Sequence, residues 1–192
     1  MTIFTRNLML SLVFLISTGF GMSVFAADEE EEGPVGKIYY TQVNIWYEKP
    51  KKIYGTNYHV GAIIPVGTKV KIKDVRSSKL FFTDEKSGTK YAIINKAKHN
   101  NISTTELLNK WFSKEDVMAP GGKFSKFTEK EQKAIKSGKV EVGMSREAVL
   151  MAYGYPPTIR TPSLDTDRWT YWRNRWVTQV ADFKDNKVSG FR

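Results

Sequence analysis

Histidine and cysteine, which carry much of nucleophilic and metal chemistry, are scarce in this 192-residue chain, with two histidines and no cysteine. Neither His59 nor His99 has a second histidine or a carboxylate pair at metal-site spacing, so we expect both to be loop or surface residues. No Gly-x-Ser-x-Gly sequence marks a nucleophilic serine, and the stretch Gly121-Gly122-Lys123 lacks the remaining residues of a phosphate-binding loop. The sequence therefore predicts no catalytic activity, metal or cofactor. The alternative is an enzyme such as a wall hydrolase, with a polar cleft around a histidine or paired carboxylates.

Two segments that mix aromatic and cationic side chains are better candidates for binding. The first, residues 168–175, reads RWTYWRNR. Together with the preceding arginine, its candidate binding residues are Arg160, Arg168, Trp169, Tyr171, Trp172, Arg173 and Arg175. Arginine beside Trp or Tyr suits a protein interface and also an anionic head group. Trp169 and Tyr171 share one face of a strand and Trp172 lies on the other, so we expect at least one aromatic set near solvent. The alternative is that one set packs under helices and Trp172 under a neighbouring domain.

The second segment, residues 46–58, reads WYEKPKKIYGTNY and is rich in aromatic residues and lysines. Its candidate binding residues are Trp46, Tyr47, Lys51, Lys52 and Tyr58. The alternative for this segment is a mobile hydrophilic loop that binds nothing.

Charge is unevenly distributed along the chain. The formal net charge is +10 at pH 7, but five acidic residues stand together at residues 28–32 (DEEEE). Residues 33–192 hold 29 basic and 15 acidic residues, which leaves a net charge of +14. A surface this basic suits a polyanionic partner. The alternative is a solvated basic surface that only keeps the protein soluble.

The first 26 residues read as a cleavable signal peptide. Arg6 supplies a positive n-region, residues 8–16 (LMLSLVFLI) are apolar, and Val24 and Ala26 are small residues at the positions that signal peptidase recognises. The alternative is an uncleaved membrane anchor. We expect a periplasmic or outer-membrane-associated protein and, without a cysteine to carry a lipid, not a lipoprotein. The polyanions available there are anionic lipids, lipopolysaccharide and wall polymers, and not nucleic acid.

Residues 35–117 have the pattern of a small β-rich domain with a helix at its end. The expected strands are residues 37–47, 60–64, 68–75, 79–83 and 89–95. The last two form a hairpin, and Ser103 with Glu106 predicts a capped helix at residues 104–112. Short strands at this spacing are typical of a small barrel or sandwich. Before this domain we expect an acidic disordered leader, residues 27–34, and after it a linker, residues 118–127.

Residues 128–192 predict a second domain with the element order ααβββ. The expected helices are residues 128–136 and 145–153, and the expected strands are 168–173, 176–183 and 187–191. Asn174 and the pair Asp185-Asn186 supply the turns of an antiparallel meander, with both helices on one face. The whole chain is therefore predicted to be α+β.

A set of short motifs runs in order through this second domain. They are residues 135–140 (IKSGKV), 143–149 (GMSREAV), 154–156 (GYP), 169–171 (WTY) and 183–188 (FKDNKV). In this respect the domain resembles the BamE domain, also called SmpA/OmlA, of outer-membrane assembly proteins. The resemblance implies an envelope binding module without catalysis. The best-known members are lipoproteins that stabilise the machine inserting β-barrel proteins, whereas this chain lacks the lipidated cysteine and carries a β-rich domain in front.

The N-terminal domain resembles SH3-like bacterial domains at residues 57–61 (NYHVG) and 64–70 (IPVGTKV). Together these features predict a non-catalytic binding or scaffold protein of the periplasm or cell envelope. Its expected partner is an envelope protein complex, such as outer-membrane assembly machinery. The alternative function is a binding module for anionic lipid, lipopolysaccharide or cell-wall polymer.

Overall fold

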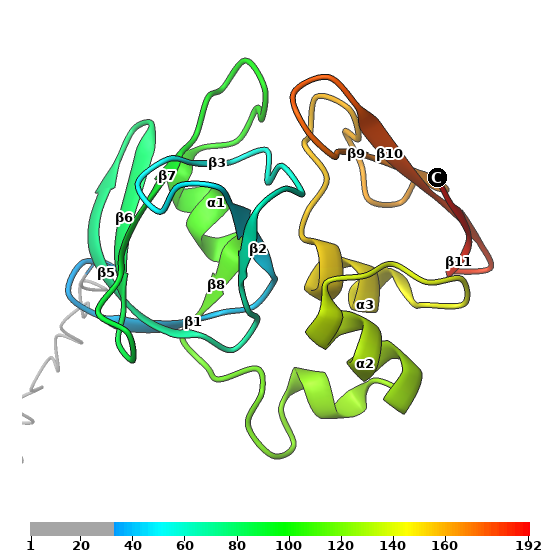
Figure 1. Cartoon of the computed structure of the whole chain (residues 1–192), viewed down its shortest axis with the longest axis horizontal. Coiled ribbons are helices and arrows are strands. Elements are labelled where there is room, and N and C mark those ends of the chain that lie inside the picture. Colours follow the sequence, from blue (N-terminus) through cyan, green and yellow to red (C-terminus); the bar gives the residue numbers. More distant parts are fainter. Residues whose placement is uncertain (1–32) are drawn as a thin grey trace, which may run out of the picture. The chain divides into compact units, whose positions relative to one another are not determined.

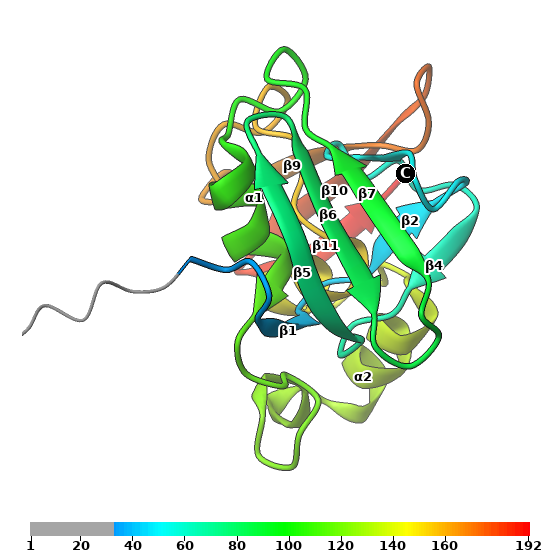
Figure 2. The ribbon, with the colours of Figure 1, turned by 90° about the vertical axis from the view of Figure 1, so that its left-hand side faces the viewer.

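In the computed structural model, which describes residues 33–192, six strands of the N-terminal half form one curled sheet (Figures 1 and 2). In sheet order they are β3 (Ile53–Tyr54), β7 (Lys90–Ile94), β6 (Lys79–Asp84), β5 (Lys69–Arg76), β1 (Ile38–Thr41) and β8 (Phe112–Ser113). Two further strands, β2 (Ile45–Tyr47) and β4 (Ala62–Ile64), pair with each other. Helix α1 (Thr104–Trp111) buries Leu107, Leu108 and Trp111 in the core that these strands enclose. The expected hairpin of β6 and β7 is confirmed.

The described residues form one compact unit of mixed α+β structure, the fold class that the sequence predicts. The predicted signal peptide, residues 1–26, and residues 27–32 of the predicted acidic leader lie outside the described residues. Within residues 33–192, no helix combines the length and the apolar character needed to cross a membrane.

The single strand expected at residues 37–47 is wrong, because the chain leaves the large sheet after Thr41. The backbone N–H of Gln42 donates to the Trp111 carbonyl, 2.9 Å away, and that of Asn44 donates to the Met151 carbonyl, 3.1 Å away. These partners on two different helices redirect the backbone, so β1 and β2 belong to different sheets. Residues 48–57, between the strands expected at 37–47 and 60–64, also contain β3, which pairs in parallel with β7.

The three α-helices within residues 33–192 begin and end close to the positions that the sequence predicts, because their caps are local. The Ser103 hydroxyl accepts from the Glu106 N–H at the start of α1. Thr128 and Glu131 form a reciprocal capping box at the start of α2 (Glu129–Ser137). The Ser145 hydroxyl caps α3 (Arg146–Tyr153). Gly138 ends α2 in the left-handed conformation, at φ 63°.

Strands β9 (Arg168–Trp172), β10 (Thr178–Lys184) and β11 (Lys187–Phe191) form the second sheet, in the order β11-β10-β9. The pairing is antiparallel, as expected for a meander. Asp185 and Asn186 have φ angles of 52° and 59°, the left-handed conformations that a tight hairpin turn requires. Helices α2 and α3 share one buried cluster with this sheet (Figure 1).

Residues 118–127, the expected linker, contain a short 3-10 helix, η1 (Lys123–Lys126). Phe124 of η1 is buried, and it belongs to the same cluster as α2, α3 and the second sheet. This segment therefore packs against the C-terminal half of the molecule and does not only connect the two halves.

Buried amide side chains join the two halves of the molecule. The Asn44 amide nitrogen donates to the Ile135 carbonyl at 2.7 Å and to the Ala152 carbonyl at 2.9 Å. The Asn44 amide oxygen accepts from the Val66 N–H at 2.9 Å. Asn57 bonds the Trp46 N–H and lies 3.4 Å from the Tyr153 carbonyl. These bonds fix the turn around residues 55–60 against the end of α3, and that turn forms one wall of the groove described next.

Candidate binding groove

A cavity of about 530 Å³ opens between three segments that are distant in sequence. They are residues 48–60 around β3, residues 94–99 after β7, and the tip of the β9–β10 hairpin at residues 174–176. In Figure 1 the tip of that hairpin lies beside the loop that follows β7. We call this cavity the groove; it is lined by Glu48, Lys49, Lys52, Tyr54, Gly55, Thr56, Tyr58, Val60, Ile94, Lys96, His99, Asn174, Arg175 and Trp176.

The groove is strongly cationic. Its lining includes Lys49, Lys52, Lys96 and Arg175, against the single carboxylate of Glu48. All four cationic side chains belong to exposed residues, and none of them forms an ion pair with a carboxylate among residues 33–192. An anion that enters the groove therefore meets cations that no carboxylate in the described part of the chain already pairs with.

Aromatic rings lie next to these cations. The ammonium groups of Lys52 and Lys96 lie 5.9 Å and 5.8 Å from the centre of the Tyr54 ring. The Tyr54 and Tyr58 rings are 5.5 Å apart between centroids. On the opposite wall, the Arg175 guanidinium lies 4.9 Å from the Trp176 ring. Trp176 is 79% exposed, an unusual position for the largest apolar side chain.

Local backbone geometry explains why Tyr54 faces the groove. Strand β3 pairs with the edge of β7 and buries Ile53 in the core, which turns the following residue, Tyr54, outward. Gly55 comes next, and a Cβ atom there would lie 2.9 Å from a methyl group of Leu107. A side chain here would push the Leu107 methyl group aside, so glycine lets the groove wall lie close against α1.

The opposite wall depends on an asparagine turn. The side-chain oxygen of Asn174 accepts hydrogen bonds from the backbone N–H groups of Trp176 and Val177, at 2.8 Å and 2.9 Å. This turn delays the start of β10 to Thr178, so the strand expected from residue 176 is shorter than predicted. As a result, Trp176 projects from the tip of the hairpin and does not lie within the sheet.

His59 fixes the groove wall to the second sheet. Its ring nitrogens lie 3.1 Å from the Trp172 carbonyl and 2.8 Å from the Tyr153 carbonyl, and the ring stacks on Tyr153 at 3.5 Å. Burial lowers the pKa of His59 from 6.5 to about 4, against the opposing effect of the two carbonyl acceptors. His59 lies in a loop, as expected, but its contacts make it a structural connection between the two halves.

The residues predicted for binding divide into three groups. Lys52, Tyr58 and Arg175 line the groove. Trp46, Trp169 and Tyr171 are buried, at 7%, 0% and 1% exposure, and pack in the core of the C-terminal half. Their aromatic area therefore stabilises the fold and is not available to a partner. The remaining predicted residues lie outside the groove lining; they are Tyr47, Lys51, Arg160, Arg168, Trp172 and Arg173.

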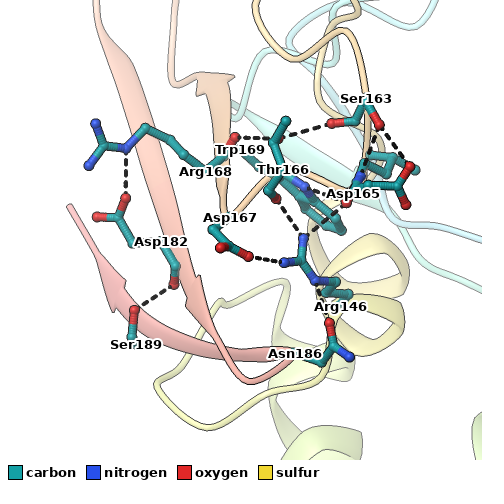
Figure 3. Close-up of polar contacts among 11 residues, drawn as sticks. Arg146, Ser163, Asp165, Thr166, Asp167, Arg168, Trp169, Asp182, Asn186 and Ser189 are labelled. Atoms are coloured by element: carbon teal, nitrogen blue, oxygen red, sulfur yellow. Dashed lines mark hydrogen bonds and ion pairs between the residues drawn. The ribbon is translucent and has the colours of Figure 1, made fainter.

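Two of the arginines outside the groove lining contact other side chains of the protein. The Arg168 guanidinium forms an ion pair with Asp182 on the neighbouring strand, at 2.7 Å (Figure 3). The Arg160 guanidinium lies 4.8 Å from the half-buried Trp172 ring. Figure 3 also shows Arg146, which bonds Asp167 and Asn186 and so joins α3 to the ends of the second sheet.

The sequence interpretation missed Lys49, Tyr54, Lys96 and Trp176 as groove residues. Lys49 and Tyr54 lie inside the candidate binding segment at residues 46–58, but nothing in their spacing separates them from their neighbours. The sequence predicts a turn at Asn174, and a longer asparagine turn there places Trp176 outside the strand. Lys96 gives no sequence signal, because only the pairing of β3 with β7 brings it to Tyr54.

Comparison of the chain with protein-family models, curated proteins and solved structures gives no match. Among residues 33–192, no three His, Asp or Glu side chains lie close enough together to hold a metal ion.

Proposed function

We propose that this chain is an exported, non-catalytic binding protein of the cell envelope that takes up an anionic ligand in the groove. The observation that carries the proposal is the set of four cationic side chains, unpaired within residues 33–192, around a cavity that also presents Tyr54 and Trp176. Convergent charges in a pre-formed cavity are the usual arrangement for binding a small charged ligand. The net charge of +14 on residues 33–192 adds a long-range attraction for the same class of ligand.

The location in the envelope rests on the sequence. A signal peptide at residues 1–26 would deliver the protein to a compartment that holds lipopolysaccharide, anionic lipid and wall polymers. The SH3-like and BamE-like interpretations of the two halves support the same location. The order α2, α3, β9, β10, β11 is the order that the BamE resemblance implies, and the curled sheet of the N-terminal half suits an SH3-like barrel.

A second candidate function is a scaffold for an envelope protein complex, such as outer-membrane assembly machinery. The observation that favours it is the exposed hairpin tip, where Trp176 and Val177 are 79% and 47% exposed beside Arg173 and Arg175. Exposed Trp next to Arg is common at the centre of protein interfaces. Crosslinking from a probe at position 177 in cells, followed by identification of the products, tests this candidate.

Binding of soluble polyanions tests the groove directly. We expect the exported protein to bind heparin and lipopolysaccharide, with an affinity that falls steeply as salt rises. The variant Lys52→Ala/Lys96→Ala removes two groove cations. The matched control, Lys69→Ala/Lys73→Ala, removes two exposed cations from β5, outside the groove lining.

The groove variant should lose at least about tenfold in affinity, while the control should lose much less. Equal losses in both variants would mean that diffuse charge and not the groove binds the anion. Absence of binding to either polyanion at low salt would overturn the proposal.

A further inference from the structure

The groove combines two kinds of wall that act on different parts of a ligand. One wall carries Tyr54 with the Lys52 and Lys96 ammonium groups, both within 6 Å of the ring centre. The other wall carries Trp176, whose ring is 79% exposed. A ligand that used only charge would need neither the Trp ring nor its position on the hairpin tip. A ligand that used only the ring would not need four cations.

We propose that the groove binds a saccharide that carries a phosphate group; this inference rests on the proposed function and names its ligand class. The C–H face of a sugar ring is apolar and carries partial positive charge, so it stacks on the electron-rich face of Trp176. The phosphate accepts from the ammonium groups of Lys52 and Lys96 beside Tyr54. Arg175, next to Trp176, donates to the same phosphate or to ring hydroxyls.

The size and polarity of the cavity fit this class of ligand. A volume of about 530 Å³ lies in the range of small-molecule sites and holds one or two sugar rings. Polar and apolar side chains share the lining, which matches a ligand with one hydroxylated and one apolar face. Trp176 is largely exposed at the hairpin tip, so a sugar within a longer polymer can reach its ring without threading the end of the polymer.

An acidic peptide is the main competing ligand, and Trp176 separates the two possibilities. A chain of glutamates would satisfy the cations but would present flexible methylene groups to the Trp ring, with little gain from stacking. A phosphosugar needs both walls at once. Replacing Trp176 should therefore weaken only the phosphosugar, while replacing Lys52 and Lys96 should weaken both ligands.

The experiment is calorimetric or fluorescence titration of the full exported protein with four probes: N-acetylglucosamine 1-phosphate, N-acetylglucosamine, inorganic phosphate and hexaglutamate. We expect N-acetylglucosamine 1-phosphate to bind at least about tenfold more tightly than either of its component parts. Trp176→Ala should reduce N-acetylglucosamine 1-phosphate to the affinity of inorganic phosphate and leave phosphate binding unchanged. Val142→Ala, at a residue 58% exposed outside the groove lining, is the control.

The possible failures are distinct. If hexaglutamate binds as tightly as the sugar phosphate, or if Trp176→Ala weakens every probe equally, the phosphosugar inference is overturned while the proposed function stands. If no anionic probe binds, both are overturned. Titration with isolated lipopolysaccharide and with isolated cell-wall polymer, each before and after enzymatic dephosphorylation, then separates the two natural sources of phosphosugar. The polymer that supplies the natural ligand should lose binding after dephosphorylation. If dephosphorylation changes the binding of neither lipopolysaccharide nor cell-wall polymer, the inference is contradicted.

Discussion

Acidification should weaken the fold through His59. The pKa of His59 is lowered by burial from 6.5 to about 4, so the folded protein holds this residue neutral at pH 7. The unfolded chain binds the proton first as the pH falls, because its histidine keeps the higher pKa. The stabilisation is therefore complete above pH 6.5 and is lost progressively as the pH falls toward 4.

The size of the effect follows from the two pKa values. One pH unit between them is worth about 1.4 kcal/mol, so the whole difference corresponds to about 3 kcal/mol of unfolding free energy. About 2 kcal/mol of this is lost by about pH 5. The carboxylate of Glu131 does not interfere, because its pKa is lowered from 4.5 to about 2 and its own contribution is lost only below 4.5.

Urea unfolding followed by tryptophan fluorescence, between about pH 7.5 and pH 5, measures this loss. His59→Phe keeps a ring on Tyr153 but cannot titrate, so its unfolding free energy should be flat over the same range. It should also be about 1 kcal/mol less stable than the wild type at neutral pH, since the hydrogen bond donated by the single N–H of the neutral ring is gone. His99→Gln, at an exposed position, is the control and should retain the wild-type slope.

Two outcomes would refute the reasoning. A wild-type stability that does not change over this range would mean that burial does not hold His59 neutral. A stability that rises on acidification would mean that the two carbonyl acceptors outweigh burial and that the folded protein holds an imidazolium.

Three further predictions concern buried contacts within the C-terminal half or between it and the N-terminal half, and all are measured by chemical unfolding. Asn44→Ala leaves the Val66 N–H and two helix carbonyls without this partner in a buried site, and should cost about 3 kcal/mol; Gln42→Ala, at a half-buried position, should cost less than half of that. Gly154→Ala puts a Cβ atom 2.5 Å from the Asn57 amide nitrogen, at a residue whose φ is 81°. Its control is Gly121→Ala, where φ is a similar 78° but a Cβ atom would have no atom within 4 Å. The Gly154 variant should lose at least about 2 kcal/mol more unfolding free energy than the control, and equal losses would contradict the predicted clash. Glu131→Gln replaces a carboxylate that accepts hydrogen bonds from Thr128 and Ser145. The variant should have an unfolding free energy about 2 kcal/mol below that of the wild type at neutral pH, and this difference should vanish as the pH falls toward 2. A difference that does not depend on pH would show that the charge of Glu131 is not responsible.

Helix ends and hairpin turns could be predicted from the sequence because their causes lie within a few residues. Thr128 and Glu131 are three residues apart, and each satisfies a backbone or side-chain group of the other. Asp185 and Asn186 are residue types that accept the left-handed conformation, and both adopt it. The helices and the second sheet therefore follow from local patterns.

The break between β1 and β2 could not be predicted, because its cause lies more than a hundred residues away, at the Met151 carbonyl. Trp46 shows the same limit. Its neighbours in sequence are Tyr47 and a run of lysines, which suggest a surface segment, yet it packs edge-on against Tyr153 at 5.3 Å. The groove is equally non-local, because its walls come from both halves of the chain and neither half contains all of its aromatic and cationic lining.

The amide bonds of Asn44 have a consequence for the order of events during synthesis. The chain leaves the ribosome from its N-terminus, so strands β1 to β8 are complete before the Ala152 carbonyl, 108 residues after Asn44, has been made. Until then the Asn44 amide nitrogen lacks both of its carbonyl acceptors, Ile135 and Ala152, which disfavours early closure of the curled sheet over it. Folding should therefore be delayed until nearly the whole polypeptide has emerged from the ribosome. Limited proteolysis of ribosome-bound nascent chains that end before residue 152 should leave no protease-resistant N-terminal fragment. In the exported protein that we propose, such a delay keeps the chain in the extended state that passage through a narrow membrane pore requires.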